Sequence, residues 1–187
     1  NVYFGKPCGL MDQMGSSVGG AVAIDFADPA APVVKKVEYD FTRSGHALCI
    51  VDTGSCHADL TDDYADITRE MGAVAAHFGK KFLRDVDEGA FRAALPQLRQ
   101  ECGDRAVLRT MHFFEEDCRA EQEAQALEQG DFAAFLALVD QSGLSSALNL
   151  QNTWSAAAPQ QQAIPVALAV GRELLGGSGA IRVHGGG

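Results

Sequence analysis

Residues 21–53 read AVAIDFADPAAPVVKKVEYDFTRSGHALCIVDT and contain three segments rich in β-branched and apolar residues. The segments cover 21–26, 33–41 and 46–53, and the turn-forming stretches ADPAAP and TRSG separate them. This spacing predicts an antiparallel meander of three strands. The third segment contains ALCIV, which is apolar on both faces, so we expect it to be the central strand.

The rest of the chain has the apolar periodicity of amphipathic helices, with spacings of three and four residues. We expect helices over 61–78, 88–100, 104–129, from Asp131 onward, and 163–175. Thr61 and Asp131 are predicted N-caps, and Gly79, Gly130 and Gly176 follow the predicted helix ends. The closing segment GAIRVHGGG (179–187) is predicted to be a strand that enters a glycine turn. Strands, then helices, then a strand indicate an α+β fold with an antiparallel sheet.

The charge of the chain limits the classes of partner that we expect it to bind. The chain has 187 residues and a net charge of −10, with its basic residues scattered. A nucleic-acid surface or an anionic membrane requires clustered Lys and Arg, so we expect neither as a partner. No apolar run is long enough to span a bilayer, and no signal-type segment is recognised. We therefore expect a cytoplasmic protein.

The five cysteines show no CxxC spacing. A disulfide framework or a zinc site is therefore not indicated, and we expect reduced, mostly buried thiols. On paper, Cys56 and His57 could form a metal cluster with His112 and Cys118. For His112, in the middle of a predicted helix, a packed or solvated histidine is the simpler interpretation.

Three separated segments resemble the galactokinases, which belong to the GHMP superfamily of small-molecule kinases. GKPCGLMDQMGS (5–16) resembles their CGxMDQ signature, and DDYADITREM (62–71) is similar to the helix that carries a sugar-contacting tyrosine. GSGAIRVHGGG (177–187) resembles the start of the glycine-rich third motif, and 108–146 looks like the helical stretch of the family that lies between these segments. The similarity covers essentially the whole chain in order. The signature is the specific part, and the other segments support it.

The resemblance implies a fold, a reaction and roles for particular residues. Asp12 matches the catalytic base that accepts the proton of the C1 hydroxyl of galactose. Gly9 matches the glycine whose backbone approaches the sugar, and Tyr64 matches the tyrosine that hydrogen-bonds a sugar hydroxyl. ATP and Mg²⁺ are the implied cofactors. A carboxylate that accepts such a proton contributes a rate factor of about 10²–10⁴.

The resemblance also predicts the domain organisation. Residues 1–20 correspond to the tail of an N-terminal, ATP-binding domain, and 21–187 to a ferredoxin-like C-terminal domain, truncated at both ends. The resemblance implies that the phosphate-binding loop, the magnesium ligand and the first sugar motif lie upstream of residue 1. GSSVGG (15–20) is not that phosphate-binding loop, because it follows the signature; it is predicted to be a flexible bend. We therefore expect the isolated 187-residue chain to be inactive. His184 and the pair Ser142-Gly143 depart from the family pattern, which bears on sugar preference.

Other interpretations of the same residues remain open. From its residue type alone, Asp12 would more often be a helix N-cap. Tyr64 could be a core residue with its hydroxyl at the rim, and the acidic run FFEEDCRAEQE (113–123) a solvated helix face. Among functions, the alternatives are a kinase for another hexose such as N-acetylgalactosamine, a non-catalytic galactose-binding regulatory protein, and an interaction module.

Overall fold

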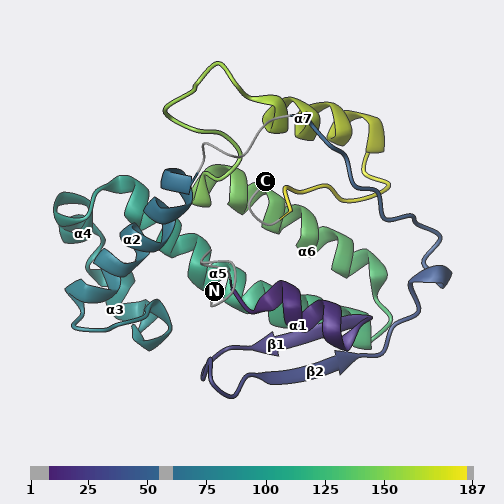
Figure 1. The fold of residues 1–187 in the computed structure, drawn as a ribbon, viewed down its shortest axis with the longest axis horizontal. Coiled ribbons are helices and arrows are strands. Elements are labelled where there is room, and N and C mark those ends of the chain that lie inside the picture. Colours follow the sequence, from purple (N-terminus) through teal and green to yellow (C-terminus); the bar gives the residue numbers. More distant parts are fainter. Residues whose placement is uncertain (1–8, 55–60, 185–187) are drawn as a thin grey trace, which may run out of the picture.

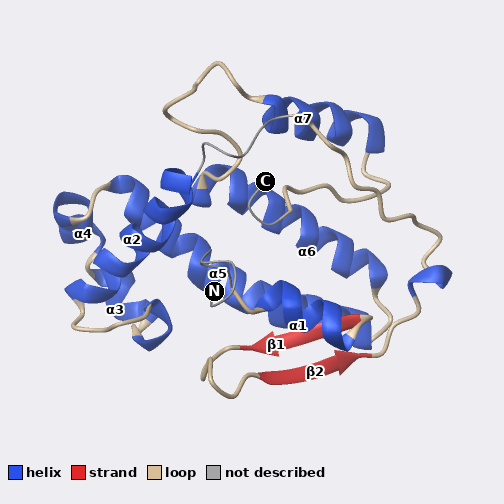
Figure 2. Ribbon diagram, viewed as in Figure 1, coloured by secondary structure: helices blue, strands red, loops and turns tan. Residues whose placement is uncertain are grey.

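The structure is a computed structural model that describes residues 9–54 and 61–184 (Figure 1). The elements occur in the order α1 (Met11–Val18), β1 (Ala21–Asp25), β2 (Val33–Val37), α2 (Thr61–His77), α3 (Glu88–Ala93), α4 (Leu95–Glu101), α5 (Asp104–Glu128), α6 (Phe132–Ser145) and α7 (Ala163–Leu175). The described part of the chain is mostly helical, with one two-stranded antiparallel sheet (Figure 2). The α+β class is confirmed in this broad sense.

The sheet is a hairpin in which Ala21 pairs with Val37 and Asp25 pairs with Val33. The first two predicted strands are therefore confirmed in shortened form. One side chain at the end of β2, Val37, is buried, whereas Lys35 is exposed and its Nζ lies 2.7 Å from a carboxylate oxygen of Glu128. Val37 and Lys35 lie on the same face of β2, so the hairpin contacts the helices through a buried valine and through an ion pair with α5.

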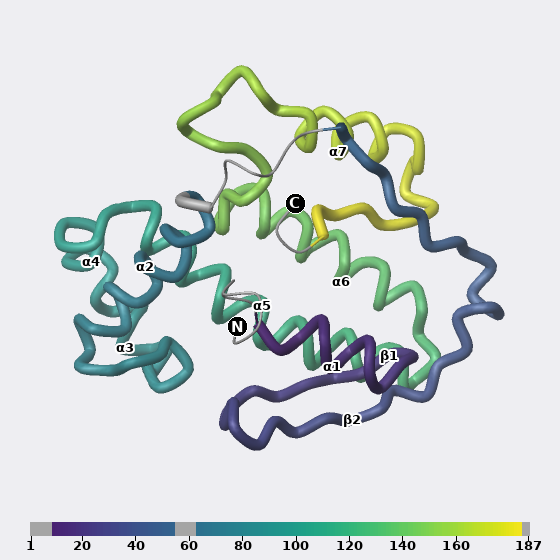
Figure 3. Tube along the Cα trace, viewed as in Figure 1, coloured from purple at the N-terminus to yellow at the C-terminus, as the bar shows by residue number. Residues whose placement is uncertain are grey.

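The predicted third strand, 46–53, is wrong. The segment has no regular secondary structure and runs from the hairpin toward α7 (Figure 3). The side chains of Leu48 and Ile50 are 95% and 94% exposed. A strand requires a neighbour that pairs with its N–H and C=O groups, and no other strand lies beside this segment in the described part of the chain. Its composition indicated strand propensity but did not supply the neighbour.

Two other loop predictions need correction. Helix α1 extends to Val18, so most of 15–20 is helical and not a flexible bend. The chain turns only at Gly19 and Gly20, whose φ angles of 69° and 74° favour glycine. At the other end of the chain, 179–184 has no regular secondary structure in place of the predicted strand, and 185–187 lie outside the described residues. The predicted ferredoxin-like sheet is therefore reduced to the hairpin within the described residues.

The predicted helices are largely confirmed, because α2, α5 and α7 agree with the expected ranges to within one residue. The range 88–100 is divided into α3 and α4 at Ala94, since Pro96 lacks an N–H group and belongs in the first turn of a helix. Asp131 caps α6, as predicted: its Oδ1 accepts a hydrogen bond of 2.9 Å from the N–H group of Ala134. Helix α2 begins at Thr61, whose side chain lies outside the described part of the chain.

The main core lies between α2, α3, α4 and α5. Its buried members are Val74, Ala75, Leu83, Val86, Phe91, Leu98, Ala106 and Val107. Phe91 and Leu98 are fully buried. Beyond this core, an aromatic cluster joins the hairpin to α6, where Phe132 stacks on Tyr39 with ring centroids 5.6 Å apart. The two clusters hold α5 between the hairpin, the α2–α4 group and α6.

Candidate functional site

Asp12 lies in the first turn of α1. Leu10 occupies the N-cap position, so the interpretation of Asp12 as a helix cap is wrong. The carboxylate is exposed, and no partner for it is found among the described residues. An acidic side chain is favourable in the first turn, where the free N–H groups carry partial positive charge. Asp12 is thus accessible to a ligand at the start of α1.

Gly9 lies immediately before α1 and is exposed. A Cβ atom placed on it would meet no heavy atom within 4 Å. Among the described residues, therefore, no neighbouring atom requires glycine at this position. That Gly9 makes room for a sugar stays a prediction.

Tyr64 lies in the first turn of α2 and is half-buried. Burial raises the pKa of the Tyr64 phenol, and the adjacent Asp63 carboxylate raises it further. The phenol is therefore neutral near pH 7 and keeps a proton that it can donate. Half-burial is compatible with both earlier interpretations, a rim residue of the core and a donor to a ligand.

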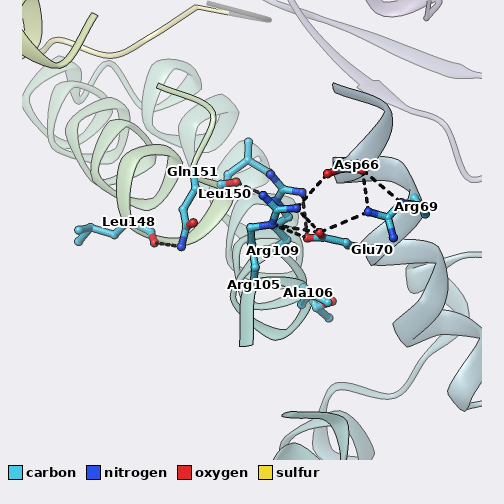
Figure 4. A network of polar contacts seen from close by, with 10 residues as sticks. Asp66, Arg69, Glu70, Arg105, Ala106, Arg109, Leu148, Leu150 and Gln151 are labelled. Atoms are coloured by element: carbon cyan, nitrogen blue, oxygen red, sulfur yellow. Dashed lines mark hydrogen bonds and ion pairs between the residues drawn. The ribbon is translucent and has the colours of Figure 1, made fainter. Parts of the chain in front are cut away.

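A network of ion pairs holds the helix that carries Tyr64 (Figure 4). Arg105 on α5 lies 2.5 Å from Glu70 and 2.9 Å from Asp66, both on α2. Arg109 lies 2.9 Å from Glu70, and its Nε donates a 3.1 Å hydrogen bond to the carbonyl oxygen of Leu150. Arg109 is only 2% exposed. The network therefore joins α2 and α5 to the end of the short π-helix Ser146–Leu150 that follows α6.

The predicted site residues come from separate elements. Asp12 and Tyr64 lie on α1 and α2, and no hydrogen bond or ion pair joins them in the described structure. His184 is exposed, and Gly185–Gly187 lie outside the described residues. Whether the three predicted residues contact one ligand stays a prediction.

The predicted thiol and histidine environments are only partly correct. Cys49 and Cys118 are exposed and Cys102 is half-buried, so the expectation of mostly buried thiols is wrong for the described cysteines. His112 is a packed histidine, as expected, with its Nδ1 atom 2.9 Å from the hydroxyl of Ser145. Burial lowers the pKa of His112.

The hypothetical metal cluster of Cys56, His57, His112 and Cys118 stays a hypothesis, because two of its members are not described. Cys56 and His57 lie outside the described residues, and in residues 9–54 and 63–184 no three His, Cys, Asp or Glu side chains gather in a way that could hold a metal ion. No helix in the described part of the chain combines the length and apolar character needed to cross a bilayer.

The interpretation of residues 113–123 as a solvated face is wrong for three of its charged residues, Glu116, Arg119 and Glu123. Glu116 is half-buried and accepts hydrogen bonds from the hydroxyl of Ser142 on α6 and from Arg119, which is 8% exposed. Arg182 completes the cluster: its Nη1 lies 2.5 Å from Ser142 and 3.5 Å from Glu116. We call Glu116, Arg119, Ser142 and Arg182 the Glu116 junction. The spacing of Glu116, Arg119 and Glu123 places them on one helix face, but it does not indicate whether that face is buried.

Comparison with known proteins identifies relatives. A galactokinase of Streptomyces coelicolor is 33% identical over 139 residues, which are 74% of this chain and 35% of that protein. A galactokinase of Streptomyces lividans is 33% identical over 134 residues, covering 70% of this chain and 32% of that protein. A galactokinase of Mannheimia succiniciproducens is 29% identical over 189 residues, which cover 100% of this chain and 46% of that protein. No family model matches the chain.

The chain spans between about a third and just under half of the length of these curated relatives. The matches cover most of it, as the resemblance of its separated segments predicted. The chain is a distant homologue of the galactokinases and belongs with them to the GHMP kinase family.

Proposed function

We propose that the protein containing this chain phosphorylates the C1 hydroxyl of galactose with ATP, giving galactose 1-phosphate and ADP. The homology to galactokinases over 70–100% of the chain carries this proposal. The position of Asp12 supports it, because the carboxylate in the CGLMDQ segment is exposed at a helix start and is not used as a cap.

In the proposed reaction, Asp12 accepts the proton of the C1 hydroxyl as its oxygen attacks the γ-phosphorus of ATP. The bond from that phosphorus to the β–γ bridging oxygen breaks, and ADP leaves. Such transfers depend on positioning and on neutralising the phosphate oxygens, with Mg²⁺ supplying charge when it is bound. Tyr64 would donate its phenolic proton to a sugar hydroxyl, and Gly9 would let the backbone approach the ring.

For the residues of this chain we propose only sugar binding and proton transfer. The described residues hold no cluster of three acidic or imidazole ligands, so no residue here is proposed to bind Mg²⁺, and none is proposed for the ATP phosphates. The proposal therefore makes Asp12, Gly9 and Tyr64 the residues to test.

The test uses the full-length natural protein that contains this chain. Sugar-dependent formation of ADP is measured with galactose, N-acetylgalactosamine and glucose. Galactose should be the best substrate. Asp12→Asn should lower kcat by about 10²–10⁴-fold while galactose binding, measured by calorimetry, is retained. Tyr64→Phe should raise KM for galactose about fivefold, the effect of one lost hydrogen bond.

Asp117→Asn is the matched control, because Asp117 is an exposed acid on α5. It should leave kcat and KM unchanged. Turnover with N-acetylgalactosamine but not galactose would replace the sugar in the proposal. Galactose binding without turnover would favour the regulatory alternative, and full activity of Asp12→Asn would remove Asp12 from the mechanism.

A further inference from the structure

Two arginines on α5 face two acidic residues on α2 (Figure 4). Arg105 and Arg109 are four residues apart, so they lie on one face of α5. Asp66 and Glu70 are spaced in the same way on α2. The Nη2 atom of Arg105 lies 2.9 Å from Asp66 and 2.5 Å from Glu70, and Arg109 approaches the same glutamate at 2.9 Å. We call these four residues the α2–α5 network.

The geometry of Arg105 makes this network specific. Its Nε atom donates to both carboxylate oxygens of Glu70, at 3.0 and 3.1 Å, and its Nη2 atom donates to Asp66 at 2.9 Å. The N–H groups of a guanidinium lie in one rigid plane, so they meet two carboxylates at once only when both are at defined positions. Arg105 thus specifies where two successive turns of α2 lie on α5.

Arg109 is itself held from two sides. Its side chain is buried between α5 and α2, and its Nε atom donates a 3.1 Å hydrogen bond to the carbonyl oxygen of Leu150. That oxygen lies at the end of the π-helix that follows α6. A buried charge without a partner is costly, so Arg109 stays directed at Glu70 and Leu150. The glutamate that Arg105 binds is therefore held in place by a second, buried arginine.

The apolar contacts of α2 lie farther from its start. Val74 and Ala75, its buried core members, belong to the C-terminal half of the helix. Hydrophobic burial is non-directional, so it attaches this half to the core without orienting polar groups at the other end. Tyr64 lies two residues before Asp66, in the first turn. At a rise of 1.5 Å per residue their Cα atoms are about 3 Å apart along the axis, so a displacement of Asp66 also displaces Tyr64.

We propose that Arg105 is a positioning residue which, together with the Arg109–Glu70 pair, holds the start of α2 so that the Tyr64 phenol reaches a hydroxyl group of the sugar. This inference rests on the proposed function. Arg105 is not proposed to contact the sugar, since it acts through Asp66, Glu70 and the backbone of α2. Loss of the α2–α5 network should therefore weaken sugar binding only while Tyr64 keeps its hydroxyl group.

The first test measures the Kd for galactose by calorimetry, and kcat, in the full-length natural protein. Arg105→Met should raise the Kd about threefold, less than the loss of the whole phenol hydroxyl would, and should change kcat less than about twofold. In the Tyr64→Phe protein, Arg105→Met should change the Kd less than about 1.5-fold, because the group through which Arg105 acts is already absent. Arg105→Lys keeps the charge but not the planar fork, so its Kd should be intermediate.

Hydrogen exchange gives a readout that requires no turnover. Exchange is compared for peptides that cover 64–72, in α2, and 88–100, which contain α3 and α4. Arg105→Met should increase exchange at 64–72 and leave 88–100 unchanged, because the network holds one segment and not the whole fold. An equal increase in both regions would mean general destabilisation and would overturn the positioning role.

Arg99→Met is the matched control. Arg99 is also an arginine in an ion pair, with its Nε atom 2.6 Å from Asp104 at the start of α5, but its side chain is 63% exposed and its partner is not on α2. It should leave the Kd, kcat and the exchange at 64–72 unchanged. If Arg105→Met does not fold, Asp66→Asn takes its place in both tests, since the half-exposed Asp66 keeps its shape as an amide. The same results are expected for it.

The outcomes separate this inference from the proposed function. The same increase of the Kd in the wild-type and Tyr64→Phe backgrounds, or unchanged exchange at 64–72, would overturn the role of Arg105. If the natural protein binds galactose without phosphorylating it, the proposed reaction fails, whereas the Kd values still decide the role of Arg105. If it binds no galactose, both fail together.

Discussion

Arg109 and Glu70 form an ion pair of 2.9 Å between α5 and α2, and the arginine is only 2% exposed. Burial lowers the pKa of Arg109, and the Glu70 carboxylate opposes this effect. The guanidinium also donates to the carbonyl oxygen of Leu150, so it has partners on two sides. Tyr64 lies less than two turns before Glu70 on α2, so the position of a proposed sugar-binding residue depends on this buried pair.

Glu70→Ala should lower the free energy of unfolding by about 3 kcal/mol, because it leaves the buried charge of Arg109 without its acidic partner. Urea unfolding measures the change. Glu88→Ala is the control, since Glu88 pairs with Arg92 at 2.7 Å on an exposed helix face and should cost less than about 0.5 kcal/mol. If Glu70→Ala and Glu88→Ala lose the same free energy of unfolding, the burial of Arg109 does not determine the cost of losing its acidic partner.

Gly143→Ala should destabilise the protein by about 1–3 kcal/mol, since its Cβ would lie 2.8 Å from the backbone oxygen of Ile181. Gly72→Ala should have the opposite effect and raise the free energy of unfolding. Gly72 is an exposed glycine within α2 with nothing within 4 Å of an added Cβ, so alanine should stabilise the helix by about 1 kcal/mol. The same urea experiment compares them, and stabilisation by Gly143→Ala would contradict the close contact with residues 181–183.

Asp131→Ala should cost about 1 kcal/mol, because it removes the hydrogen bond of 2.9 Å that caps α6. Asp117→Ala removes an exposed acid from the middle of α5 and should be neutral or slightly stabilising, since alanine has the higher helix propensity. Thermal unfolding followed by circular dichroism distinguishes them. A loss no larger for Asp131→Ala than for Asp117→Ala would mean that the cap contributes nothing.

His112 should make the protein less stable in mild acid. Burial lowers its pKa in the folded state, with Glu116 opposing this effect and Arg119 and Arg182 adding to it. The unfolded chain, with a histidine pKa of about 6.5, therefore binds a proton before the folded chain does. Stability should fall as the pH decreases below about 6.5 and continue to fall until the lower folded pKa is passed.

Urea unfolding at pH 7.5 and pH 5.5 should show a smaller loss in His112→Asn than in the wild type. Glu123 acts in the opposite direction, because burial raises its pKa, and comparison of the two proteins cancels its contribution. Parallel pH profiles would exclude His112 as the source of the acid sensitivity.

The helices illustrate what can be predicted from the order of residues. The repeat of Tyr64, Ile67, Met71, Val74 and Phe78 specifies an amphipathic helix within a few turns of chain, and α2 covers almost all of it. Capping by Asp131 and the turn at Gly130 are equally local, since each depends on two to four neighbouring residues. The CGLMDQ segment was recognised in the same way, from adjacent residues.

The strands and the polar clusters required the folded chain. Segment 46–53 has strand composition, but a strand exists only when another backbone pairs with it. Glu116 appeared to belong to a solvated face because its partners, Ser142 and Arg182, are 26 and 66 residues away. Local periodicity and turn chemistry therefore determined the helices, and the resemblance of the CGLMDQ segment supplied the candidate base. Contacts between distant residues decided the sheet, the buried ion pairs and the attachment of residues 181–183.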